Sequence, residues 1–259
     1  MNGPGPREGC NGKHNVILVH GAWHRPDCWN GVISCLDNSR FHVAVPDLNP
    51  VRHADDGIRP PETQTLLDLI TTNNLDHIIL VGHSYGGTII AELAGLAPHR
   101  MEHLVFLNAF VPVRNKSIMD DLPRYHKKVL TDLAVGEGSI RLPYQAWRDT
   151  FMNGAGDKLA ETTYQQLVPE PLARFTRKSQ AEPVSLLDIP RTYIHSADDI
   201  ALPPGKWGWV PRMPRRLGRH RLVHIDGNHE VIFTAPAIVA EEIQAAVHSC
   251  PGTNRRGRL

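Results

Sequence analysis

Short apolar runs alternate along the chain with stretches whose apolar residues recur at helical spacing. The runs have the length of strands and fall at residues 15–20, 41–45, 78–81, 104–107, 191–195 and 221–225. The helical pattern falls at residues 27–38, 64–73, 85–97 and 235–248, with Thr63 as a candidate cap for the second of these helices. Strands and helices alternating at this rhythm predict a doubly wound, mainly parallel sheet, and hence an α/β fold.

The alternation breaks between residues 112 and 187, where the sequence is charged and interrupted. Short helical patterns remain there at residues 119–134, 143–153 and 157–167. Ligands of open α/β sheets bind at the carboxyl ends of the strands, so an insertion between two late core strands predicts a helical cap over a pocket. A surface insertion with no role in binding is the alternative. The predicted parts are a flexible leader (1–13), a core (14–111 and 188–249), the cap (112–187) and a disordered basic tail (250–259).

Composition excludes some partners. The 259 residues are 41% hydrophobic and 21% charged with a net charge of +1, which gives no sign of a nucleic-acid or membrane partner. Residues 1–13 lack the apolar run of a secretory signal. Scattered cysteines (Cys10, Cys28, Cys35 and Cys250) predict free thiols in a reducing, cytoplasmic setting. Without a glycine-rich phosphate loop or metal-ligand spacing, we expect a small-molecule substrate and no cofactor; a homodimer is left open.

Residues 82–86 read Gly-His-Ser-Tyr-Gly, a G-x-S-x-G motif between an apolar strand and a helical stretch. This is the context of the nucleophile elbow of the α/β-hydrolases, in which a sharp turn presents a serine hydroxyl at the positive end of a helix. The two glycines remove side chains that would collide where strand and helix pass closely. Ser84 is therefore the candidate nucleophile; a glycine-rich turn that contains serine by chance is the alternative.

A serine hydroxyl needs a base and a group that orients the base. In this fold class the order along the chain is serine, acid, histidine. Asp198 follows the strand at 191–195 and is the predicted acid, with the adjacent Asp199 as the alternative. His229 follows the last core strand and a Gly-Asn turn and is the predicted base, whereas His224 lies within that strand and is expected to be a packing residue.

An oxyanion intermediate needs two backbone N–H groups aimed at its oxygen. Tyr85, the residue after the nucleophile, is expected to supply one of them. The loop after the first core strand contains Gly21, Ala22 and Trp23, and Ala22 is the predicted second donor. Trp23 is a candidate wall of the substrate pocket.

The motifs around these residues resemble those of one group of proteins. Residues 19–24 (Val-His-Gly-Ala-Trp-His, with Trp29 beyond), 82–87, 196–203 and 227–229 are similar to motifs of the plant methylesterase and hydroxynitrile lyase group and its bacterial relatives, within the α/β-hydrolases. The resemblance covers residues 14–110 and 189–248 and includes no motif of the predicted cap. It implies an α/β-hydrolase fold with Ser84, Asp198 and His229 as nucleophile, acid and base, and with Ala22 and Tyr85 as oxyanion donors.

Two residues depart from the lyases of this group. Those lyases place a lysine directly after the catalytic histidine, where this chain has Glu230, and a threonine where it has Gly21. Both departures favour ester chemistry over cyanohydrin cleavage. Glu230 is expected either to begin the last helix or to meet a cationic or hydrogen-bonding group of the substrate.

The sequence therefore predicts a cofactor-independent serine hydrolase. The expected reaction is cleavage of a small, largely apolar ester, lactone or thioester through an acyl-enzyme on Ser84. Two alternatives remain open. One is a non-hydrolytic enzyme with His229 as its base, such as a lyase, a cyclase of a natural-product intermediate or a cofactor-free dioxygenase; the other is a small-molecule receptor on the same fold.

Overall fold

A parallel sheet forms the centre of the protein, in a computed structural model that describes residues 13–49, 60–135 and 138–247. Its order is β2-β1-β3-β4-β8-β9, and every neighbouring pair is parallel. The strands are β1 (His14–Val19), β2 (Phe41–Ala44), β3 (Ile78–His83), β4 (Met101–Leu107), β8 (Arg191–Ser196) and β9 (Arg221–Ile225). The predicted doubly wound, mainly parallel α/β sheet is confirmed. The predicted leader and tail lie outside the described residues, apart from residue 13.

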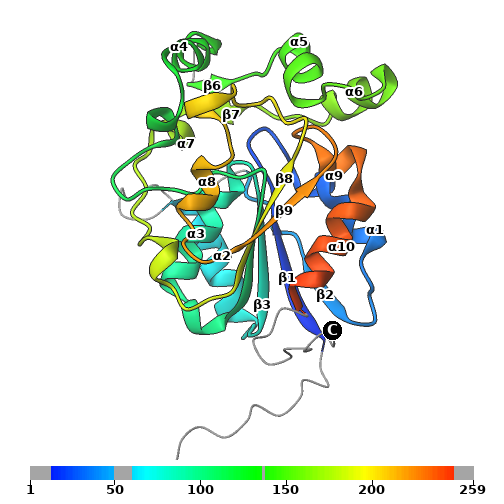
Figure 1. Ribbon diagram of the computed structural model, residues 1–259, viewed down its shortest axis with the longest axis vertical. Coiled ribbons are helices and arrows are strands. Elements are labelled where there is room, and N and C mark those ends of the chain that lie inside the picture. Colours follow the sequence, from blue (N-terminus) through cyan, green and yellow to red (C-terminus); the bar gives the residue numbers. More distant parts are fainter. Residues whose placement is uncertain (1–12, 50–59, 136–137, 248–259) are drawn as a thin grey trace, which may run out of the picture.

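Helices cover both faces of this sheet (Figure 1). They are α1 (Asn30–Cys35), α2 (Pro61–Thr72), α3 (Gly86–Leu96), α8 (Arg212–Arg215), α9 (Val231–Thr234) and α10 (Pro236–Val247). Successive strand residues point to opposite faces, so Leu80 packs in the core beneath α2 and α3 while Ile79 and Val81 pack in the core beneath α1 and α10. Both faces are thus buried, as the uninterrupted apolar runs of the strands require.

The segment between β4 and β8 contains a small layer that lies above one end of the sheet (Figure 1). Its helices are α4 (Arg124–Leu133), α5 (Tyr144–Ala146), α6 (Asp157–Tyr164) and α7 (Leu172–Thr176). The prediction of a helical cap did not include a small antiparallel sheet, which is formed by β5 (Ala134–Val135), β6 (Ser139–Ile140) and β7 (Glu170–Pro171). Strands this short cannot display an alternating pattern.

Other details differ from expectation at helix ends. Helix α2 begins at Pro61, so Thr63 lies inside it, and the Thr63 hydroxyl donates to Glu92 instead of capping the helix. Short turns of helix complete the chain: η1 (Pro26–Trp29), η2 (Pro98–Arg100), η3 (Ile118–Asp121), π-helical η4 (Trp147–Phe151), η5 (Val184–Leu186) and η6 (Gly205–Trp207). Cys28 and Cys35 are free thiols, and Cys10 and Cys250 lie outside the described residues. None of the described helices has the length and apolar character needed to cross a membrane.

Candidate active site

The turn after β3 holds Ser84 in a left-handed backbone conformation, with φ of 52°. Such a conformation costs roughly 1–3 kcal/mol for a residue with a side chain and persists only where the surroundings enforce it. Hydrogen bonds supply that constraint, because Ser84 N donates to Leu107 O at 3.1 Å and Phe110 N donates to Ser84 O at 3.0 Å. Glycine is required at both flanking motif positions: a Cβ on Gly82 or Gly86 would lie 2.7 or 2.6 Å from a backbone carbonyl oxygen.

His229 is bound to a carboxylate from the turn after β8. Its Nδ1 lies 2.7 Å from Asp199 Oδ2, and both side chains are buried. The second oxygen of this carboxylate accepts a hydrogen bond from Ala201 N at 2.9 Å. The carboxylate is therefore fixed in orientation, and it holds the imidazole in turn.

The predicted acid, Asp198, is not the carboxylate bonded to His229; the alternative, Asp199, occupies that position. Asp198 is exposed and takes part in the site only through its backbone: its N–H donates to Gly227 O, and its carbonyl accepts from Asn153 Nδ2. The Asp198 side chain is exposed, whereas the side chain of Asp199 is buried against His229. Because adjacent residues in a turn diverge in direction, the motif alone does not decide between the two.

Aromatic rings enclose His229. Trp209 stacks on the imidazole with centroids 5.5 Å apart, and Phe151 meets it edge-on at 5.4 Å. Burial by itself lowers the pKa of His229, but the charge and hydrogen bond of Asp199 outweigh it and hold that pKa above its usual value of 6.5. This environment therefore stabilises the protonated, imidazolium form of His229.

Ser84 and His229 line one cavity of about 320 Å³. This lies at the lower end of the range for small-molecule sites, about 300–1,000 Å³. Its wall comes mainly from the segment above the sheet and from the loop after β8; the apolar and aromatic side chains are Trp23, Phe110, Leu122, Tyr125, Val129, Leu130, Leu133, Leu142, Pro143, Ala146, Phe151, Ala201, Leu202 and Trp209. His126 and Thr150 add polar groups. The cavity suits a small, mostly apolar molecule.

The loop after β1 lies directly beside the serine. A Cβ on Gly21 would lie 3.0 Å from Ser84 Cβ and 3.1 Å from His83 Nδ1, so a larger residue there would press on the elbow. Within the described parts of the chain, no acceptor is recorded for the backbone N–H of Ala22 or of Tyr85. Trp23 lines the cavity with its ring, but its backbone N–H and its indole N–H both donate to protein oxygens, so neither is available to a ligand.

Glu230 is buried beneath the site and does not line the cavity. One of its carboxylate oxygens lies 3.1 Å from His24 Nε2, and the residue also precedes α9 as its N-cap. Burial alone would raise the pKa of Glu230, but the charge and hydrogen bond of His24 lower it to about 2. Glu230 therefore precedes a helix, although this is α9 and not the last helix, α10 (Pro236–Val247), that was expected. Its absence from the cavity lining gives no support to contact with a substrate group.

One cluster of the described residues has the ligand types and spacing that a metal ion needs. It consists of His24, His83 and Glu230, whose candidate ligand atoms lie within 4.8 Å of one another. His24 Nε2 lies 3.2 Å from Glu230 Oε1, and His83 Nε2 bonds to His229 O at 3.1 Å. Among the described residues, Glu230 Oε2 and His83 Nδ1 are buried without a hydrogen-bond partner. The rings of Trp29, Trp147 and Phe233 pack around the two histidines. The cluster is thus a hydrogen-bonded His24–Glu230 pair within an aromatic enclosure.

Asn108 is a structural residue of the site that the motifs did not indicate. Its Nδ2 donates to Ser196 Oγ at 2.8 Å and to His229 O at 3.1 Å, and Ser196 N donates back to Asn108 Oδ1 at 2.8 Å. It thereby joins the ends of β4 and β8 to the loop that carries His229. An asparagine placed directly after a buried apolar strand is the signal in the sequence that could have identified it.

A parallel six-stranded sheet with a serine elbow after β3 and an aspartate-bound histidine after β9 defines the α/β-hydrolase class. The chain belongs to the alpha/beta hydrolase family, whose family model matches residues 16–242.

Relatives from bacteria and plants support the predicted resemblance. The chain is 36% identical over 115 residues to the carbendazim hydrolyzing esterase of Nocardioides sp., covering 42% of this chain and 48% of that protein, so it spans about half of this relative. It is 27% identical over 247 residues to the probable esterase PIR7A of Oryza sativa subsp. indica, covering 92% and 90% of the two chains. A solved Paenibacillus extracellular alpha/beta-hydrolase, described as sharing structural and functional homology with tobacco salicylic acid binding protein 2, superposes with a TM-score of 0.83 at 29% identity, covering 90% of this chain and 98% of that one.

Proposed function

We propose that the protein is a carboxylic-ester hydrolase that acts through an acyl-enzyme on Ser84. The observation that carries the proposal is the shared cavity: Ser84 and His229 both line it, and His229 is held by Asp199 at 2.7 Å. An aspartate-oriented imidazole beside a serine is the arrangement that activates a hydroxyl for acyl transfer. The names of the bacterial and rice relatives, both esterases, support the same reaction class.

The chemistry follows from the hydrogen bonds. With Nδ1–H donating to Asp199, the lone pair of His229 is on Nε2 and can accept the proton of Ser84 Oγ as this oxygen attacks the carbonyl carbon. The N–H groups of Ala22 and Tyr85 stabilise the negative oxygen of the tetrahedral intermediate. The carbon–oxygen (or carbon–sulfur) bond to the leaving group then breaks, and the leaving group takes the proton from His229. Water repeats the sequence on the acyl-enzyme, releasing the acid and restoring Ser84.

The proposed substrate is small and largely apolar, and an ester, a lactone and a thioester each fit the chemistry. The 320 Å³ cavity and its apolar wall support this substrate class. Cyanohydrin cleavage is disfavoured because Glu230 faces His24 outside the cavity and the crowded position 21 has no hydroxyl group. A cytoplasmic location and a homodimer remain proposals, as does the absence of nucleic-acid, membrane and cofactor partners.

A fluorophosphonate probe tests this function. It reacts with an activated serine, so wild-type protein should gain the probe on Ser84 and hydrolyse short aryl esters, and Ser84→Ala should lose both properties. A non-hydrolytic enzyme would instead keep its activity in Ser84→Ala and lose it in His229→Ala. A receptor would bind its ligand stoichiometrically without turnover, and absence of both labelling and ester hydrolysis would contradict the proposal.

A further inference from the structure

Every polar group of Trp23 is bonded to the segment above the sheet. Trp23 N donates to Glu170 Oε2 at 2.8 Å, and Trp23 Nε1 donates to Ile140 O at 3.0 Å. Val168 N donates to Trp23 O at 2.9 Å. A residue of the loop after β1 is therefore held by three separate bonds from a segment that follows it by more than one hundred positions in sequence.

Trp23 needs this support because its backbone is in the left-handed region, with φ of 63°. A bulky side chain disfavours that region, so the surrounding structure must enforce it. The Trp23 N–H belongs to the peptide unit that directly follows Ala22. A bond to this N–H consequently restrains the position of Ala22, the proposed oxyanion donor beside Ser84.

Glu170 is itself fixed by a buried ionic network. Arg174 donates from Nη1 to Glu170 Oε1 at 2.7 Å and from Nε to Glu62 Oε1 at 2.5 Å, and these three side chains are at most 3% exposed. Arg174 Nη2 also donates to Leu48 O at 2.7 Å, and Arg177 pairs with the second oxygen of Glu62. The Glu170 carboxylate, which accepts the hydrogen bond from Trp23 N, is therefore anchored to both the core and the layer above it.

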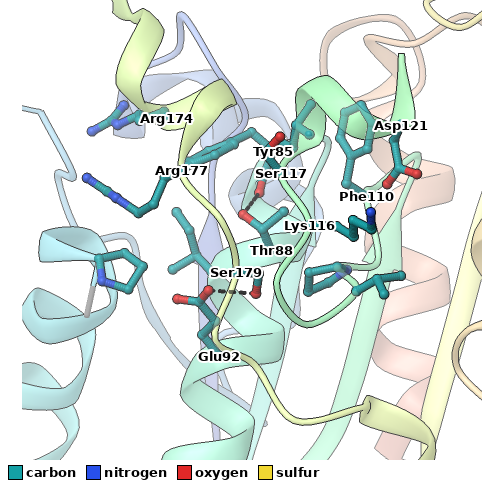
Figure 2. Close-up of a pocket in the computed structure, with 15 residues that line it drawn as sticks. Tyr85, Thr88, Glu92, Phe110, Lys116, Ser117, Asp121, Arg174, Arg177 and Ser179 are labelled. Atoms are coloured by element: carbon teal, nitrogen blue, oxygen red, sulfur yellow. Dashed lines mark hydrogen bonds between the residues drawn. The ribbon is translucent and has the colours of Figure 1, made fainter. Parts of the chain in front are cut away.

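Arg174 belongs to the short helix α7, and this helix also contacts Tyr85, the other proposed oxyanion donor. The Arg174 guanidinium lies 5.8 Å from the centroid of the Tyr85 ring. Phe175 lies 5.5 Å from the ring centroid of Trp23 and 6.3 Å from that of Tyr85. Figure 2 shows Arg174 and Arg177 to the left of Tyr85.

We propose that Glu170 is a positioning residue, which holds Trp23 and through it Ala22, so that the segment above the sheet completes the oxyanion site instead of only covering the pocket. This inference rests on the proposed function. Burial raises the pKa of Glu170 despite the nearby charge of Arg174, so the ionised carboxylate carries a desolvation cost. A costly buried charge whose second oxygen accepts a loop N–H fits a positional role better than a purely stabilising one.

The chain offers a matched control in Glu92 of α3. This carboxyl group is also buried, its pKa is also raised by burial, and its Oε1 accepts a hydrogen bond from Ser179 Oγ at 2.8 Å (Figure 2). Glu92 thus connects α3 to the segment after α7, in the same way that Glu170 connects the segment above the sheet to the loop after β1. Its hydrogen bonds go to Thr63, Ser179 and the backbone of Gln180, none of which carries a proposed donor.

The test compares Glu170→Ala, Glu170→Gln and Glu92→Ala by ester kinetics, melting temperature and hydrogen exchange of the Trp23 amide. Glu170→Ala should lower kcat by about 10- to 100-fold with little change in KM, and the Trp23 amide should exchange faster. Glu170→Gln has one oxygen for two donors; with that oxygen on Trp23 N and its NH₂ group facing Arg174, it should lower the melting temperature but retain kcat within about threefold and a protected Trp23 amide. Glu92→Ala should lower the melting temperature and keep kcat within about twofold.

Unchanged kcat and unchanged Trp23 exchange in Glu170→Ala would overturn the inference, as would an equal loss of kcat in Glu92→Ala. If Glu170→Ala does not fold, a Glu170→Gln protein with a protected Trp23 amide but a kcat lowered more than about tenfold would overturn it. Failure of the proposed function looks different: the wild-type protein would neither hydrolyse esters nor bind the fluorophosphonate. Trp23 exchange would then still decide whether Glu170 holds the loop.

Discussion

Replacing Asp199 by asparagine should reverse the hydrogen bonding of His229. Asp199 accepts from both His229 Nδ1 and Ala201 N, one on each oxygen. An asparagine has one oxygen, and the Ala201 N–H can be satisfied only by that oxygen, so the amide NH₂ would face Nδ1. The imidazole would then accept at Nδ1 and carry its hydrogen on Nε2, where it cannot take a proton from Ser84.

The expected loss is large. The same carboxylate-to-amide change in other Ser-His-Asp sites lowers kcat by about 10⁴, or about 5 kcal/mol at 1.36 kcal/mol per tenfold. Asp198→Asn is the matched control, since that side chain is exposed and only its backbone contacts the site, and kcat should stay within about twofold. Steady-state hydrolysis of a short aryl ester, with melting temperatures for both variants, measures the difference. Equal effects, or a larger loss for Asp198→Asn, would refute the assignment of Asp199.

Three further outcomes follow from the site. Because Asp199 raises the pKa of His229 and the protonated imidazole is inactive, kcat/KM should rise with pH through a midpoint above 6.5; a midpoint at or below 6.5 would contradict this environment. Gly86→Ala should lower the free energy of unfolding by about 1–3 kcal/mol, because its Cβ would lie 2.6 Å from a backbone carbonyl oxygen of β1. Gly95→Ala in the same helix would place its Cβ in open space and should not lower the free energy of unfolding. Denaturant titration of both variants measures the difference. Glu230 has a pKa of about 2 in the folded protein, below its unfolded value, so its ionised form stabilises the fold by on the order of 3 kcal/mol above pH 5. That contribution is lost as the pH falls toward 2. Glu230→Gln should therefore flatten this part of a stability-versus-pH curve, and an unchanged curve would count against the His24–Glu230 pair.

The sequence was informative wherever one periodic pattern had a single physical reading. The apolar run at 78–81 predicted a strand buried on both faces, and the glycines around Ser84 predicted a close backbone approach. The buried strand and the 2.6–2.7 Å distances to hypothetical Cβ atoms agree with both predictions. His229 followed from its place after the last core strand. These features depend on neighbours in sequence, which a pattern records.

Features that depend on distant neighbours were not predictable in this way. Asp198 and Asp199 have the same chemistry, and the bonds that separate them come from Gly227 and Asn153, on other segments. Glu62 and Arg174 are 112 positions apart, and each would be expected on the surface when considered alone. Only the folded chain brings such charges together and shows which of them is buried.

The most direct test of the account is to trap the acyl-enzyme. A short aryl ester mixed with the protein and quenched in acid within the first turnover should give a chain that is heavier by one acyl group, and peptide mapping should find that group on Ser84. Ester or substrate turnover with no acylated chain, together with full activity in Ser84→Ala and none in His229→Ala, would contradict the central claim that Ser84 is the nucleophile.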